Sequence, residues 1–388
     1  MMQTYFKRFI RNFDFLLFFV YLFLILFGLV MIYSSSYVWA VGRYKWEPDY
    51  FFGKQIINLA IAFPAFFLAA FFPYKNFKRK KFMMFSVVGM LILLFLVHII
   101  GSGDAVGAQR WIHLGFGSIQ PSEVAKLIII IYFSSVFAKK YEAGTIDNLN
   151  QSIAPPLAIL MLVVGSIMME TDIGNSIIII VVALSVMAAS GIKTKTFLKL
   201  SVLISGLLFF VATYLYFNWD TIMTAGRQGR FLSFMNPFDY DLTSGYQIVN
   251  GYIAIGSGGV KGLGLGNSIQ KMGYLPEPHT DVIMAIISEE LGIIGALIVI
   301  GGLGFIVLRA LSIALKARDP QARMLAAGVG SMIGIQTFVN IGGLIGIIPL
   351  TGVPLPLISY GGTSVILTSI AIGILMNVSM FVKLENNK

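Results

Sequence analysis

The chain has 388 residues, of which 57% are hydrophobic and only 12% are charged, and its mean hydropathy is +0.84. Soluble domains carry roughly 25% charged residues, so this composition excludes a soluble protein and indicates an integral membrane protein. The formal net charge of +10 does not call for a nucleic-acid partner, because basic residues of membrane proteins gather in cytoplasmic loops beside anionic lipid.

Apolar segments long enough to cross a bilayer recur along the whole chain. A spanning helix needs roughly 20 residues. The first segment follows three basic residues, as a signal peptide would, but it is too long for one and no small-residue cleavage site follows it. We therefore predict an all-α polytopic membrane protein with ten transmembrane helices in a single membrane domain, residues 1–388. The helices are expected near residues 13–33, 51–72, 82–100, 122–138, 153–169, 174–191, 197–217, 280–308, 324–346 and 359–382.

The positions of lysine and arginine predict the orientation of these helices. If the N-terminus is cytoplasmic, most of the 28 Lys and Arg residues fall in loops on that side of the membrane, and Lys126 lies inside a helix. Cytoplasmic loops are the ones enriched in Lys and Arg. With an even number of helices, both termini are predicted to be cytoplasmic.

One outer segment is much longer than the other loops. Residues 218–273 lie between the seventh and eighth predicted helices and include the amphipathic stretch from Tyr246 to Ile255. Loops of this length are usually functional or disordered, and this one is not of low complexity, so we expect an extracytoplasmic loop folded against the membrane surface. Its glycine-rich part, Gly262 to Ser268, lacks the Lys and the βαβ context of a nucleotide loop. A flexible or tightly turning loop is expected there instead.

Several charged residues lie inside or at the ends of predicted helices, where lipid makes them costly. Glu123 and Lys126 are three residues apart and share a helix face. They form either an internal ion pair or the first turn of an ordinary helix that begins at Pro121. Glu289 and Glu290 are interpreted as buried acids that pair helices.

The strip from Tyr274 to Asp281 places a carboxylate at the mouth of a long apolar segment. Two prolines stiffen this strip. Taken alone, Asp281 is interpreted as a helix cap favoured by the helix dipole. Arg110 and Trp111, taken alone, are interpreted as residues of the membrane interface.

Five motifs in order along the chain together resemble the SEDS family of bacterial cytoplasmic membrane proteins, whose members are of FtsW, RodA and sporulation types. The resemblance implies ten-helix proteins, in agreement with the count of apolar segments. Residues 71–75, 219–238 and 250–270 resemble the FtsW type, which we favour, whereas 349–354 is closer to the RodA type. The motifs are Gly107–Ile112, Gln120–Lys126, Gly262–Lys271, Tyr274–Asp281 with Glu289–Gly292, and Pro354–Ser364.

This resemblance implies a peptidoglycan glycosyltransferase that polymerises glycan strands from lipid II at the division septum and releases undecaprenyl pyrophosphate. The implied partners are a class B penicillin-binding protein transpeptidase, other division proteins and membrane lipid. A RodA-type polymerase for cell elongation is one alternative, and a lipid II flippase is another. Against the flippase, no inverted repeat is evident and the candidate site residues cluster outside the membrane.

Such a glycosyl transfer needs a base for the acceptor hydroxyl and positive charge for the pyrophosphate. Asp281 matches the essential outer aspartate of the family and is assigned as the general base. Zero cysteines and three histidines without metal-ligand spacing predict no protein-bound metal site, although a divalent cation, Mg²⁺ or Mn²⁺, stays open as a cofactor. The residues expected to contact substrate are Arg110, Trp111, Gln120, Glu123, Lys126, Arg230 and His279.

Overall fold

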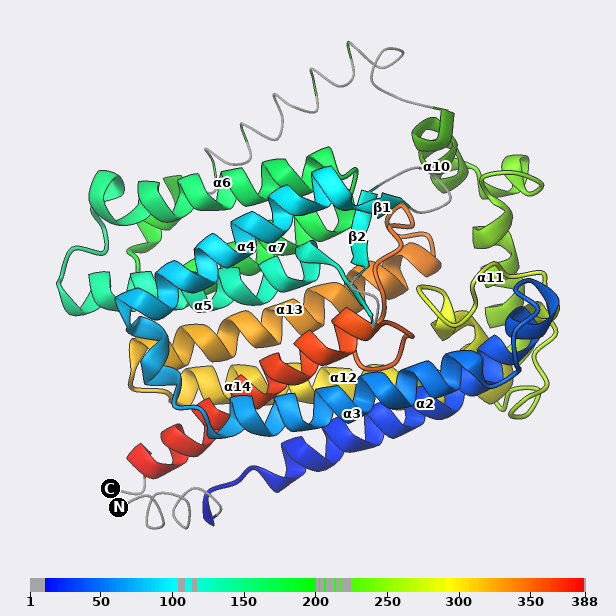
Figure 1. Cartoon of the computed structure of the whole chain (residues 1–388), viewed down its shortest axis with the longest axis horizontal. Helices are drawn as coiled ribbons and strands as arrows, with labels where there is room; N and C mark the ends of the chain where they lie inside the picture. Colours follow the sequence, from blue (N-terminus) through cyan, green and yellow to red (C-terminus); the bar gives the residue numbers. More distant parts are fainter. Residues whose placement is uncertain are drawn as a thin grey trace.

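The computed structural model describes residues 11–103, 109–113, 117–199 and 225–386, together with the single residues 202, 206, 213 and 217. Most of these residues form long helices that lie nearly side by side in one bundle (Figure 1). The helices of the bundle are α2 (Phe15–Gly42), α3 (Tyr50–Phe71), α4 (Lys80–Ile100), α5 (Pro121–Glu142), α6 (Ala154–Met169), α7 (Ile173–Ala188), α12 (Ile283–Lys316), α13 (Pro320–Leu344) and α14 (Gly362–Asn386).

The predicted helical membrane fold is confirmed. Among the described residues, eight helices are long and apolar enough to cross a membrane, and α7 is a shorter apolar helix. These helices correspond to all the predicted spans except the one at 197–217, of which the structure describes only residues 197–199, 202, 206, 213 and 217. The total of ten helices therefore stays a prediction.

Helix α13 lies at the centre of the bundle, in contact with α5, α7, α12 and α14, and α14 in turn packs along α3. Small residues allow this close packing. At Gly373 of α14, for example, an added Cβ would clash with the carbonyl oxygen of Phe66 on α3. This packing fixes the C-terminal end of α13, which carries part of the candidate site.

The beginning and the end of the described chain meet at one end of the bundle, where α2 starts and α14 finishes (Figure 1). The Asp14 side chain is only 1% exposed. Its Oδ2 accepts hydrogen bonds from Arg309 Nε at 2.8 Å and from Ser379 Oγ at 3.0 Å, and Lys383 Nζ is 3.9 Å away. These contacts hold the start of α2 and the last turns of α14 at the same end of the bundle, and the cytoplasmic placement of both termini stays a prediction.

A short antiparallel sheet departs from the all-α prediction. Its strands are β1 (Ser102–Gly103), β2 (Gln109–His113) and β3 (Ser118–Ile119), in the order β1-β2-β3. Ile112 is buried while its neighbour His113 is exposed, as expected for a strand with one face on the protein. The sheet contacts the ends of α4 and α5 and carries Arg110 and Trp111.

The eighth predicted span, 280–308, is not one straight helix. Gly292 interrupts α12 with φ 64° and ψ −159°, and a Cβ at this position would clash with the carbonyl oxygen of Val260, so only glycine fits. The glycine-rich loop satisfies carbonyls freed by this break, because Leu263 N donates to Glu289 O and Gly264 N donates to Glu290 O, both at 2.9 Å. The expectation of a tightly turning loop is confirmed.

The outer segment before α12 is folded over its described part, and the amphipathic stretch is a helix as expected. Helix α11 packs against α12 and α13 through its buried face. The remaining elements of this segment and of the other connections are short: η1 (Tyr74–Lys78), η2 (Leu149–Ile153), α10 (Ala225–Met235), η3 (Pro237–Tyr240), α11 (Tyr246–Gly258) and η4 (Gln270–Met272).

Asp14→Ala is expected to lower the free energy of unfolding by about 2 kcal/mol, because it removes the shared acceptor of three groups at this end of the bundle. Thermal unfolding of the purified protein in detergent measures the change. Lys193→Ala serves as control, since Lys193 and Asp147 form an exposed pair at 3.6 Å that is expected to contribute about 0.5 kcal/mol or less. Equal effects of the two substitutions would contradict the role of Asp14.

Candidate functional site

Asp281 lies two residues before the start of α12, and one hydrogen bond holds its side chain while another holds its backbone carbonyl. Thr280 Oγ1 donates to Asp281 Oδ1 at 3.0 Å, and Asn340 Nδ2 on α13 donates to the Asp281 carbonyl oxygen at 2.6 Å. The residue is half-buried. Ser359 Oγ donates to the carbonyl oxygen of the preceding Thr280 at 2.6 Å. The carboxylate is therefore carried on a fixed backbone and keeps part of its surface accessible. The helix-cap interpretation is not supported, since the cap position of α12 is Val282.

His279, the other member of the strip predicted to bind substrate, is only 2% exposed. Its ring centroid is 4.1 Å from that of Phe51 and 5.5 Å from that of Tyr360. Burial lowers the pKa of the imidazole to about 3, so it is neutral at physiological pH. His279 packs the strip against Phe51 on α3, and its expected contact with substrate stays a prediction.

The second group of predicted site residues lies at the first turns of α5. Lys126 and Glu123 are both buried, and their side chains form an ion pair of 2.6 Å between Nζ and Oε1. Lys126 Nζ also donates to Gln336 Oε1 on α13 at 3.0 Å. The sequence left open whether this was an internal pair or an ordinary helix start; the structure shows the pair within the first turns of a helix that begins at Pro121. The ammonium group of Lys126 is oriented by two acceptors, Glu123 Oε1 and Gln336 Oε1.

A polar cluster around Asp172 adjoins this turn of α5. Asp172 caps α7 by accepting from Asn175 N at 3.2 Å, and its Oδ2 also accepts from Asn175 Nδ2 at 2.8 Å. Gln120 Nε2 and Ser122 Oγ each donate to the same oxygen at 3.4 Å. Gln120 is thus placed beside Asp172 at the start of α5, close to the Glu123–Lys126 pair.

Arg110 reaches this region from the sheet. Its Nη2 donates to the Thr171 carbonyl oxygen at 2.9 Å and its Nε to the Glu170 carbonyl oxygen at 3.4 Å. Thr171 has a positive φ of 61°, so the turn between α6 and α7 is tight and the arginine stabilises its carbonyls. Arg110 therefore adjoins the turn that leads to Asp172, while Asp172 is bonded to Gln120 and Ser122 at the start of α5.

The carboxyl group of Glu170 in this turn is only 2% exposed, and neither of its oxygens has a hydrogen-bond partner among the described residues. Burial, with a smaller contribution from the negative charge of Asp172, raises the pKa of Glu170 to about 8, although Arg110 acts in the opposite direction. Glu170 is therefore a largely protonated acid near neutral pH.

Two amide side chains that were not predicted connect Asp281 with Lys126. Gln336 and Asn340 are four residues apart on α13 and face the outer loop before α14. Asn340 Nδ2 donates to the carbonyl oxygens of Asp281 and Val353, and Gln336 Nε2 donates to the Pro354 carbonyl oxygen at 3.0 Å. Because Gln336 also accepts from Lys126, one helix face holds both parts of the site in register. The spacing of Gln336 and Asn340, four residues apart in an otherwise apolar helix, could have indicated from the sequence that α13 forms polar contacts inside the protein.

Two other predicted residues are not brought into this arrangement by any described contact. Trp111 follows Arg110 on β2, half-buried, with its carbonyl accepting from Ser102 Oγ at 3.2 Å. Arg230 lies on α10, and its side chain is outside the described part of the chain. Their expected contacts with substrate stay predictions.

A separate hollow of about 540 Å³ lies at the other end of α3 and is not part of this site. Its lining is apolar and offers no group for acid–base or charge chemistry. It is formed by Pro64, Phe67, Leu68, Phe71, Phe72 and Pro73, whereas the strip with Asp281 adjoins the opposite end of α3 at Phe51.

Comparison with known proteins gives full-length matches. The family model described as "Cell cycle protein", for FtsW, RodA and SpoVE, matches residues 14–384. The chain is 46% identical to the probable peptidoglycan glycosyltransferase FtsW of Bacillus subtilis, over 98% of this chain and 94% of that protein. It is 36% identical to the stage V sporulation protein E of the same bacterium, over 95% of this chain and 97% of that protein.

Solved structures share the fold. A chain from a peptidoglycan synthase complex, described in terms of the coordination of polymerization and crosslinking, superposes with a TM-score of 0.76 at 23% identity, covering 95% of this chain and 98% of that chain. RodA of Thermus thermophilus superposes with a TM-score of 0.65 at 23% identity, covering 95% and 96%. The similarity extends over the whole bundle.

Glu170→Gln is expected to stabilise the protein above about pH 5 and to flatten its pH dependence. The pKa of Glu170 is raised in the folded state, so its stabilising contribution is complete below the unfolded-state pKa of 4.5 and is lost as the pH rises towards 8. At pH 8 the variant should be more stable by about 4 kcal/mol. Thermal unfolding between pH 5 and pH 9 tests this, with exposed Glu47→Gln as control; parallel profiles for wild type and Glu170→Gln would refute it.

Proposed function

The chain belongs to the FtsW/RodA/SpoVE family of cell cycle proteins, and on this basis we propose that it polymerises peptidoglycan glycan strands from lipid II at the bacterial cytoplasmic membrane. The FtsW relatives in the comparison are named as probable peptidoglycan glycosyltransferases. Sequence identity is 46% to FtsW of Bacillus subtilis and 23% to RodA of Thermus thermophilus, which favours septal synthesis during division over a RodA-type role in elongation.

The proposed reaction joins the 4-hydroxyl of one disaccharide to the anomeric carbon of another. The bond between the anomeric carbon and the pyrophosphate oxygen breaks, and undecaprenyl pyrophosphate leaves with the bonding electrons. Asp281 accepts the proton of the attacking hydroxyl as general base. Lys126 and Arg110 lower the energy of the negative charge that develops on the pyrophosphate.

The observation that carries this proposal is the connection between Asp281 and Lys126 through one face of α13. Asn340 fixes the backbone of the proposed base, and Gln336 orients the ammonium group of Lys126. A base and a cation held by the same rigid helix meet the requirement that donor and acceptor be oriented together. The Glu123 carboxylate holds the Lys126 side chain in place through an ion pair of 2.6 Å.

The proposed steps use only residues of this chain. Whether a divalent cation also takes part as a cofactor is a separate question. Among the described residues no group of three or more His, Asp or Glu side chains is arranged to hold a metal ion. If Mg²⁺ or Mn²⁺ takes part, the pyrophosphate of the substrate would have to supply ligands, as is common for Mg²⁺.

We also propose a class B penicillin-binding protein as partner, since a protein of the same fold belongs to a synthase complex that couples polymerization to crosslinking. Lipid II carries a long isoprenoid chain, so both substrates reach the site from the bilayer, and other division proteins would place the complex at the septum. A lipid II flippase is the competing function for a bundle of this kind.

Asp281→Asn is expected to lower the rate of glycan polymerisation by about 10²–10⁴-fold, because the amide cannot accept the hydroxyl proton. The assay combines the purified protein with its penicillin-binding partner and lipid II in detergent and separates glycan strands by gel. Glu47→Gln, an exposed change of the same kind, should leave the rate unaltered. Persistent polymer with Asp281→Asn would exclude this base, and lipid II crossing vesicle bilayers without any polymer from wild type would favour the flippase.

The double variant Glu123→Gln/Lys126→Met is expected to fold and to lose about 10²–10³-fold in polymerisation, because it removes the cation without leaving an unpaired buried carboxylate. Lys126→Met alone should be less stable than the double variant. Size-exclusion chromatography and thermal unfolding establish folding, and the lipid II assay gives the rate. A folded double variant with the wild-type rate would remove Lys126 from pyrophosphate binding.

A further inference from the structure

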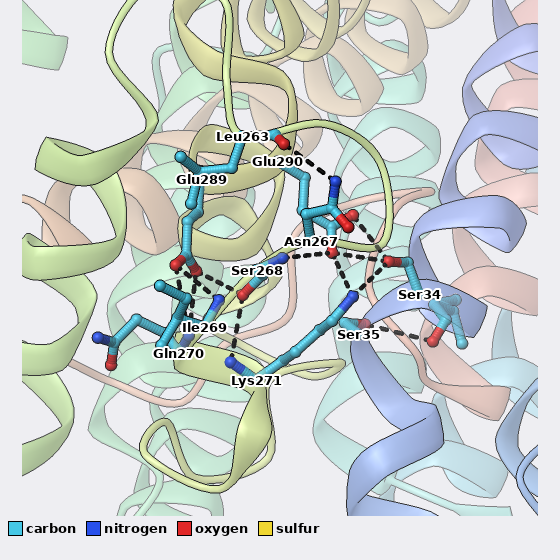
Figure 2. Close-up of polar contacts among 11 residues, drawn as sticks. Ser34, Ser35, Leu263, Asn267, Ser268, Ile269, Gln270, Lys271, Glu289 and Glu290 are labelled. Carbon is cyan, nitrogen blue, oxygen red and sulfur yellow. Dashed lines mark hydrogen bonds and ion pairs between the residues drawn. The ribbon is translucent and has the colours of Figure 1, made fainter.

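A second buried ion pair lies outside the proposed site, where the glycine-rich loop meets α2 and α12 (Figure 2). Lys271, counted from the sequence as an outer-loop charge, is 0% exposed. Its Nζ is 2.5 Å from Glu290 Oε1 and 3.1 Å from Ser34 Oγ on α2, and it lies 5.0 Å from the centroid of the Tyr37 ring. One ammonium group therefore joins three elements: η4, α12 and α2.

The neighbouring carboxylate acts on the same short turn. Glu289 accepts hydrogen bonds from the backbone N–H groups of Ile269, at 2.9 Å, and Gln270, at 3.3 Å, and from the Ser268 hydroxyl. Backbone N–H groups at the start of a helical turn need such acceptors. Glu289 thus holds the start of η4 against α12 (Figure 2), while Glu290 binds its lysine. The prediction that these acids are buried is confirmed, but they pair a loop with helices and not only helix with helix.

The strip that carries Asp281 begins immediately after this anchor. Lys271 and Tyr274 are separated by two residues, and the indole Nε1 of Trp39 on α2 donates to the Leu275 carbonyl oxygen at 2.9 Å. At the other end, Ser359 and Asn340 fix the carbonyls of Thr280 and Asp281. The strip is therefore held at both ends, and the attachment at its start is the buried ion pair of Lys271 and Glu290.

Stability alone is a weak reason for such a pair. Removing two charges from water costs several kcal/mol, and well-packed apolar side chains often replace a buried ion pair without loss of stability. An ion pair with defined acceptors instead fixes one arrangement of the chain. That is useful where a displacement of about 1 Å at the reacting group lowers the rate by about 10²-fold.

We propose that Lys271 and Glu290 are positioning residues for Asp281: their ion pair ties the start of the strip to α2 and α12, so that the proposed base stays in register with Lys126. This inference rests on the proposed function. The pair is expected to affect kcat and not the KM for lipid II, because neither residue is placed in contact with lipid II.

Kinetic measurements on three variants test this assignment. Lys271→Met is expected to lower kcat about 10²-fold with KM for lipid II changed less than about threefold. Lys271→Gln/Glu290→Gln, whose amides can bond to each other without charge, should recover at least about tenfold of that loss. Asp14→Ala is the control, because it breaks an ion-pair cluster at the opposite end of the bundle and should leave kcat of the folded protein unchanged.

A second readout does not depend on catalysis. The chain has no cysteine, so Tyr274→Cys gives a single site, exposed on the strip, for a nitroxide spin label. The label is expected to become more mobile when Lys271→Met is added and to keep its mobility when Asp14→Ala is added. Folding of each variant is checked by thermal unfolding.

The outcomes separate the two levels of inference. If wild type makes no polymer, the proposed function fails, while the mobility of the label still decides whether the pair holds the strip. If Lys271→Met is folded, has the wild-type kcat and leaves the label unchanged, the positioning role is excluded. A loss confined to KM would likewise overturn it, because it would place the pair in substrate binding.

Discussion

Hydrogen bonds from the amides of Gln336 and Asn340 to loop carbonyls are the interaction on which the outer end of this protein depends. In an apolar bundle, backbone that is neither helix nor sheet must find partners inside the protein. The carbonyls of Asp281, Val353 and Pro354 find them on α13. The central helix of the bundle thereby sets the relative positions of the strip and the loop before α14.

Two buried ion pairs lie near the candidate site, and in each the positive and the negative charge compensate one another. The Glu123–Lys126 and Lys271–Glu290 pairs are both buried, and each is completed by a neutral acceptor or donor, Gln336 in one and Ser34 in the other. Such completion is what makes a buried pair tolerable, because remaining lone pairs and protons would otherwise go unsatisfied. The two pairs differ in place: one adjoins the proposed reaction and the other anchors the chain that leads to it.

Much of the bundle followed from the sequence, because a run of apolar residues of spanning length is typical of a membrane helix and rare elsewhere. The internal pair at Glu123 was one of two arrangements that helical spacing allowed. What the sequence did not show depends on single residues. Hydropathy cannot detect the break at Gly292, which comes from one pair of backbone angles. The position of Lys271 in the outer segment did not show that its side chain is buried in an ion pair with Glu290. His279 was chosen for its position in a motif, yet its burial against Phe51 depends on contacts between distant segments.

The break at Gly292 also separates α12 mechanically into two parts. Spanning helices generally adjust their tilt to the thickness of the bilayer, and a residue with non-helical φ and ψ does not transmit a tilt as a straight rod would. The loop is bonded to both sides of the break, because Leu263 and Gly264 donate to the carbonyls of Glu289 and Glu290 before it and Ile293 after it donates to Gly259. Asp281 therefore takes its position from the hydrogen bonds of Ser359 and Asn340, and not from a straight continuation of α12.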